Sequence, residues 1–170
     1  MSNLAYSSPV EDADSLPAVL VVEDDADIRK VLRLACEAGG YATQTVADGV
    51  EALAWLRACA DPQIVVLDYH MPRLDGWAVL SAVAADPALA GAGHAFILLT
   101  AAAASLPPAF DGPLRQMAVS VAAKPIAVLQ LHRLLADATD RIRRDEYGCG
   151  TSAGTATSTY GWRAWSAKRW

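Results

Sequence analysis

The chain has 170 residues, of which 54% are hydrophobic, and its formal net charge is −5. This length suits one globular domain with a full core and leaves too few residues for two domains of ordinary size. An acidic chain also lacks the basic surface that a general nucleic-acid binder needs to meet phosphates. Cys36, Cys59 and Cys149 are too widely spaced to indicate a disulfide framework or a metal-ligand set.

The sequence predicts a cytoplasmic protein without a membrane segment. Its first residues lack the basic-then-apolar order of a signal peptide. The longest apolar stretch, residues 95–104, is about half as long as a membrane-spanning helix.

Strand-like apolar runs alternate with helical periodicity from about residue 18 onward. Residues 1–17 are polar and acidic, and we expect them to form a disordered lead. Asp25 or Asp27 can cap the first helix, which Gly39-Gly40 ends, and Asp48-Gly49 precedes the second. The expected strands cover residues 19–22, 41–46, 64–67, 96–99 and 119–122, and the later helices cover 74–85 and 126–144. The first helix should bury one face, formed by Ile28, Val31, Leu32, Ala35 and Cys36. The last helix should bury the stripe formed by Val128, Leu131, Leu135, Ala138 and Ile142.

The runs that are apolar throughout predict strands buried on both faces, as in a parallel sheet covered by helices. We therefore expect an α/β three-layer sandwich. A dinucleotide-binding version would have a glycine-rich turn after the first strand, where this chain has Glu23-Asp24-Asp25. We therefore expect the flavodoxin-like version, with five parallel strands in the order 2-1-3-4-5.

Polar side chains follow four of the expected strands, and the strand order 2-1-3-4-5 places them at one edge of the sheet. Asp24 follows the first strand and Asp68 the third, while Thr100 and Lys124 end the fourth and fifth. Clustered carboxylates favour a hard cation such as Mg²⁺. Asp68 could then accept a phosphoryl group, with Lys124 and Thr100 neutralising the charge that develops.

With these motifs in this order, residues 18–144 resemble the receiver domain of two-component response regulators. The matching segments are V-L-V-V-E-D-D, L-D-Y-H-M-P-R-L-D-G, L-L-T-A and A-K-P. The resemblance implies that Asp68 is the phosphoacceptor and that Thr100 and Lys124 contact the phosphoryl group. It also implies a Mg²⁺ site formed by the carboxylates of Glu23, Asp24 and Asp68 and the backbone carbonyl of His70.

Two segments depart from the family pattern. Val121 stands where the family usually has a tyrosine or phenylalanine that turns inward with the switch threonine, Thr100. Between Thr100 and Met117, the prolines of Pro107-Pro108 and Asp111-Gly112-Pro113 break a helix interior. We therefore expect the fourth helix of the family to be short, displaced or absent.

Residues 145–170 predict a flexible tail. Residues 148–161 are rich in glycine, serine and threonine, and the end reads W-R-A-W-S-A-K-R-W. The simplest interpretation is a disordered extension without a function. The alternative is docking to a protein partner, an anionic membrane surface or single-stranded nucleic acid.

The expected function is that of a phosphoryl-accepting switch rather than an enzyme, beyond phosphorylating itself from small donors and dephosphorylating itself. Its partners would be a histidine kinase or histidine phosphotransfer protein and a downstream protein, with no DNA-binding output domain expected. One alternative is a receiver-like scaffold that no longer switches. Another is an aspartate-based phosphohydrolase, which would favour a second aspartate where His70 stands.

Overall fold

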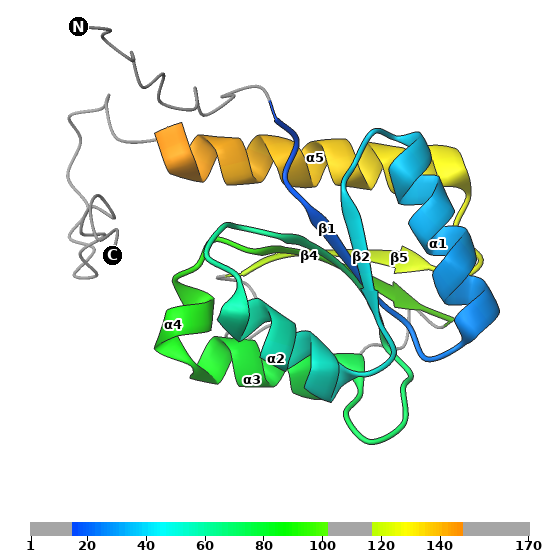
Figure 1. The fold of residues 1–170 in the computed structure, drawn as a ribbon, viewed down its shortest axis with the longest axis horizontal. Helices are drawn as coiled ribbons and strands as arrows, with labels where there is room; N and C mark the ends of the chain where they lie inside the picture. The colour runs from blue at the N-terminus through cyan, green and yellow to red at the C-terminus, as the bar shows by residue number, and fades with distance from the viewer. Residues whose placement is uncertain (1–14, 102–116, 148–170) are drawn as a thin grey trace, which may run out of the picture.

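A five-stranded parallel sheet lies at the centre of the molecule (Figure 1). The structure is a computed structural model that describes residues 15–101 and 117–147. The strands are β1 (Val19–Val22), β2 (Thr43–Val46), β3 (Ile64–Asp68), β4 (Ala95–Thr100) and β5 (Ala118–Ala123). Their order across the sheet is β2-β1-β3-β4-β5, and every neighbouring pair is parallel. The predicted flavodoxin-like α/β fold is confirmed.

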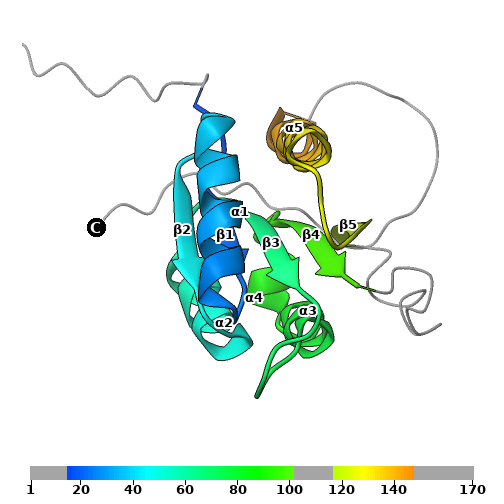
Figure 2. The ribbon, with the colours of Figure 1, turned by 90° about the vertical axis from the view of Figure 1, so that its right-hand side faces the viewer.

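Helices cover both faces of the sheet (Figure 1). One face packs against α1 (Ala26–Ala38) and α5 (Val128–Tyr147). The other packs against α2 (Gly49–Ala58) and α3 (Gly76–Ala85), with the short α4 (Pro87–Ala90) beside them. Figure 2 shows α5 nearly end-on, with strands lying between it and α3.

Alternate residues of each central strand enter two separate cores. Val19 and Val21 of β1 face α1 and α5, whereas Leu20 and Val22 face α2 and α3. Every residue of β1, β3 and β4 is buried, as expected for strands covered on both sides. On α5, the predicted stripe is buried at Leu131, Leu135, Ala138 and Ile142.

An aspartate begins each of the first three helices. Of the two residues predicted to cap α1, Asp25 does so, and its Oδ1 accepts 2.9 Å hydrogen bonds from the backbone N–H groups of Asp27 and Ile28. Asp48 caps α2 in the same way. Asp75 caps α3, so this helix begins at Gly76 rather than at residue 74 as predicted.

Apolar residues near the start of α1 and α5 are exposed, which corrects the prediction from helical periodicity. Ile28 and Val31 of α1 are 41% and 62% exposed, and Val128 of α5 is 52% exposed. Periodicity places these residues on the helix face that points to the core. However, no described residue fills the apolar groove between α1 and the β5–α5 connection, where Ile28 and Val31 lie.

Two elements differ from the prediction, and one predicted feature lies outside the described residues. The glycine- and alanine-rich connection before β4 contains α4, which the sequence did not predict. Helix α5 continues to Tyr147, three residues beyond its predicted end. The expected break in the family's fourth helix concerns residues 102–116 and lies outside the described residues, as do residues 1–14 and 148–170.

Candidate functional site

Three carboxylates meet where the first and third strands end. Glu23 and Asp24 directly follow β1, and Asp68 is the last residue of β3. These strands are hydrogen-bonded neighbours in parallel register, with Val22 opposite Leu67. One oxygen from each of the three side chains lies within 4.8 Å of the others. The topology therefore brings these residues together as the sequence predicted.

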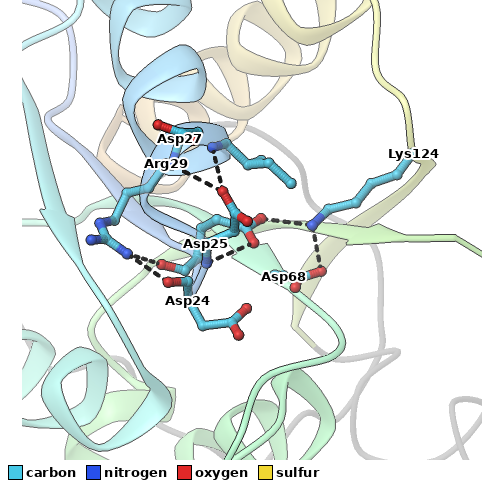
Figure 3. A network of polar contacts seen from close by, with 8 residues as sticks. Asp24, Asp25, Asp27, Arg29, Asp68 and Lys124 are labelled. Carbon is cyan, nitrogen blue, oxygen red and sulfur yellow. Dashed lines mark hydrogen bonds and ion pairs between the residues drawn. The ribbon is translucent and has the colours of Figure 1, made fainter.

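Lys124 enters the same cluster from the far edge of the sheet (Figure 3). Its Nζ lies 2.6 Å from Glu23 Oε2 and 2.8 Å from Asp68 Oδ1. The residue directly follows β5, and its backbone N–H donates a 2.8 Å hydrogen bond to the carbonyl of Thr100. One ammonium thus bridges two carboxylates that would otherwise repel each other in a buried site.

Burial and charge shift two pKa values in this cluster. Burial raises the pKa of Glu23, and the nearby charge of Asp68 adds to this, although the hydrogen bond from Lys124 opposes the shift. Burial lowers the pKa of Lys124, but its hydrogen bonds to Asp68 and Glu23 outweigh that effect, so the pKa is raised overall. Lys124 therefore remains an ammonium throughout the neutral range.

Arg29 fixes the backbone of the acidic segment, a role that sequence reasoning missed. From α1, its Nη1 donates hydrogen bonds of 2.6 Å to the carbonyl of Glu23 and 3.1 Å to that of Asp24 (Figure 3). The sequence signal that could have identified this role is the position of Arg29, four residues after the cap Asp25. A helical side chain at that position lies beside the helix N-terminus.

A second ion pair supports the loop after β3, and the sequence did not predict it either. Arg73, which has a positive φ of 68°, pairs with Asp48, the cap of α2. Where this loop ends and α3 begins, a Cβ added at Gly76 would lie 2.5 Å from the carbonyl oxygen of Asp68. The glycine thus permits the close return of the chain that positions Asp68.

The other predicted site residues lie on β4, on β5 and in the loop after β3. Thr100 ends β4, next to β3, and is 1% exposed. His70 is exposed in the loop two residues after Asp68. Val121 lies in β5 and is 40% exposed, so this residue is at the surface rather than in the core.

The ligand types of the acidic cluster fit a hard cation. All three candidate side chains offer oxygen, which suits Mg²⁺ or Ca²⁺ rather than zinc or copper. Lys124 contacts one oxygen each of Glu23 and Asp68, and every carboxylate has two. The arrangement therefore retains oxygen ligands for a cation beside the ammonium.

The described residues thus form a flavodoxin-like α/β domain in which an acidic cluster and a lysine meet at the carboxyl ends of the strands. Residues 19–136 match the family model of the response regulator receiver domain. Since this match covers more than half of the chain, the protein belongs to the response regulator receiver domain family. The resemblance noted in the sequence is confirmed.

Individual relatives agree with this assignment. Response regulator MprA of Mycobacterium sp. (strain KMS) is 50% identical over 58 residues, which are 34% of this chain and 25% of that protein. A sensor protein from Polaromonas sp. JS666 is 27% identical with a TM-score of 0.63, over 74% of this chain and 98% of that one. The receiver domain of the sensor histidine kinase PA1611 from Pseudomonas aeruginosa PAO1 is 26% identical with a TM-score of 0.60, over 74% and 99% of the two chains.

The matched segments of the first curated relatives are short. They span 25–29% of the length of those proteins. The receiver domain that the family model matches in this chain belongs to two-component signalling. None of the described helices is long and apolar enough to cross a membrane.

Proposed function

We propose that this protein is a phosphoryl-accepting switch of a two-component system, with Asp68 as the phosphoacceptor. The observation that carries the proposal is the geometry around Asp68: Lys124 Nζ lies 2.8 Å away, and carboxylate oxygens of Glu23 and Asp24 lie within 4.8 Å. The phosphoryl donor is a histidine kinase or a histidine phosphotransfer protein, and the phosphorylated form acts by contact with a downstream protein.

The chemistry assigns a separate task to each side chain. Lys124 binds Oδ1 of Asp68, so Oδ2 is the attacking oxygen. This oxygen forms the new bond to phosphorus as the P–N bond of the donor phosphohistidine breaks, and the imidazole leaves with a proton from water. Lys124 and the hydroxyl of Thr100 then bind phosphoryl oxygens and stabilise their charge.

Glu23, Asp24 and Asp68, with the backbone carbonyl of His70, would hold Mg²⁺, which neutralises phosphoryl charge when bound. The donor chemistry supports this assignment, because the three side chains offer oxygen ligands only. The receiver domain of PA1611 was solved with a magnesium ion coordinated in its active site cleft. Arg29 holds the carbonyls of Glu23 and Asp24, which keeps the two carboxylates directed toward the site.

Phosphorylation by a small acyl-phosphate donor tests the proposal directly. Intact mass should show one phosphoryl group on the wild type in the presence of Mg²⁺ and none after its chelation. Asp68→Asn should abolish the gain, whereas Asp27→Asn, which changes an exposed aspartate of α1, should retain it. A phosphoryl group on Asp68→Asn at the wild-type rate would place the acceptor elsewhere and reject the proposal.

One observation favours a scaffold that binds phosphoryl groups without switching. Val121 occupies the position of the family's usual aromatic residue and is 40% exposed. A beryllofluoride phosphate mimic separates the two functions. A switch should shift backbone amide resonances of β4, β5 and α5, whereas a scaffold should shift only those beside Asp68. Asp68→Asn serves as the control, since it should not bind the mimic.

A further inference from the structure

An apolar groove lies next to the proposed phosphoacceptor site and shares Lys124 with it. We call it the α1–β5 groove, and its volume is about 490 Å³. Its apolar lining comes from α1, the end of β4 and the β5–α5 connection, namely Ile28, Val31, Leu32, Leu99, Pro125 and Ile126. Asp27 and Lys124 complete the lining. Such a volume is within the range of pockets that hold organic side chains or ligands.

The groove exposes apolar side chains that helix α1 would normally bury. Ile28 and Val31 are 41% and 62% exposed, although they lie four residues and one residue before the buried Leu32. Removing this apolar surface from water would contribute about 25 cal/mol per Å². A contiguous apolar surface between α1 and the β5–α5 connection therefore favours an occupant.

The chain itself contains a segment with suitable chemistry. Residues 162–170 include Trp162, Trp165 and Trp170, and aromatic residues of this size dominate the energetics of buried interfaces. The same segment carries Arg163, Lys168 and Arg169, while residues 148–170 contain no aspartate or glutamate.

The charge beside the groove is complementary to this segment. Asp24, Asp25 and Asp27 are exposed around the start of α1. Asp27 itself lines the groove, together with Lys124. A basic segment that places an indole in the groove would bring its cations to these carboxylates, which favours the pairing and sets its orientation.

The connecting residues are long enough for the segment to reach the groove. Helix α5 begins two residues after Ile126 of the groove and has 20 residues, so Tyr147 lies about 30 Å from the groove. The 14 residues 148–161 span up to about 46 Å when extended. A glycine- and serine-rich linker of this length would span roughly 20 Å on average, which would keep the effective concentration of residues 162–170 near the millimolar range. This value exceeds the concentration of a second copy in dilute solution.

We propose that residues 162–170 bind the α1–β5 groove of their own chain, with a tryptophan inserted between α1 and the Pro125-Ile126 connection. The bound segment covers a surface directly beside Asp68. Docking is thus a contact within one molecule and does not depend on the proposed phosphorylation.

Heteronuclear NOE measurements on the full chain, without a phosphoryl donor, test this docking. In the wild type, the backbone amides and indole N–H groups of residues 162–170 should give NOE values close to those of the helices. Val31→Glu places a charge in the groove and should lower these values to those of a random coil. Leu129→Glu is the matched control, because Leu129 is 64% exposed outside the groove and its substitution should leave the values unchanged.

A second variant changes only residues 162–170 and leaves the residues that form the groove unchanged. Replacing Trp162, Trp165 and Trp170 together by serine should remove ring-current shifts from the methyl groups of Ile28 and Val31. Random-coil NOE values in the wild type, or equal losses in Val31→Glu and Leu129→Glu, would overturn the proposal. NOE values that rise with protein concentration would also overturn it, because the occupant would then be a second copy.

Discussion

Lys124 is the side chain on which the charge balance of the site depends. It contacts Glu23 and Asp68 at 2.6 Å and 2.8 Å, so two buried carboxylates share its single positive charge. We expect Lys124→Met to slow phosphorylation from a small donor by about 100-fold, the usual loss when one charge-stabilising donor is removed. Initial rates by intact mass would measure this effect.

Lys30→Met is the control for that substitution, since Lys30 is an exposed lysine of α1. It should phosphorylate at the wild-type rate. If Lys124→Met and Lys30→Met reacted equally fast, the ammonium at the site would have no role in the transfer.

Glu23 determines how the proposed Mg²⁺ affinity depends on pH. Burial raises its pKa above the ordinary 4.5, so the folded protein takes up this proton at a higher pH than the unfolded chain. Mg²⁺ needs the ionised form, and its affinity should therefore fall as the pH decreases toward 4.5 from above. In the metal-free protein, the same proton uptake favours the folded state over that range.

Calorimetric titration of Mg²⁺ at a series of pH values would test this dependence. Glu23→Gln should bind Mg²⁺ more weakly, and its affinity should change less with pH across that range. An identical pH dependence in both proteins would mean that another group controls binding.

At the scale of single elements, aspartate caps place the site. Asp25, Asp48 and Asp75 each accept backbone N–H groups at a helix start, which fixes where the chain turns after a strand. These positions could be predicted from the sequence to within two residues, because capping depends on neighbours along the chain.

Asp48 has a second role, because it also pairs with Arg73 of the loop after β3. Asp48→Ala should lower the free energy of unfolding by about 1–2 kcal/mol, as expected for a lost cap. Asp137→Ala, at an exposed aspartate inside α5 that caps no helix, should change it by less than about 0.5 kcal/mol. Chemical denaturation would measure both, and equal losses would argue against a special role for Asp48.

At the scale of the whole molecule, α5 completes the core on one face of the sheet. Leu135 is fully buried in the cluster that contains β1, β3 and β4, whereas Leu129 of the same helix is 64% exposed. Leu135→Ala should lower the free energy of unfolding by about 2–5 kcal/mol. Leu129→Ala should change it by less than about 0.5 kcal/mol. Thermal or urea unfolding would show whether α5 is this important to the fold.

Most of the fold could be predicted from the sequence because its signals are local. The apolar runs of β1, β3 and β4 indicate buried strands through their own composition, and the strand order follows from the acidic turn after β1. Glu23, Asp24 and Asp68 could be identified because they are covalently adjacent to those strands. Each of these inferences needs only a few consecutive residues.

Tertiary structure decided the contacts that join distant parts of the chain. Lys124 pairs with Glu23 across 101 positions, and Arg73 reaches Asp48 through a loop of irregular shape. Likewise, periodicity predicted Ile28 and Val31 to be buried, yet both line the α1–β5 groove. Helical periodicity determines which way a side chain points, whereas its exposure depends on which distant segment packs against it.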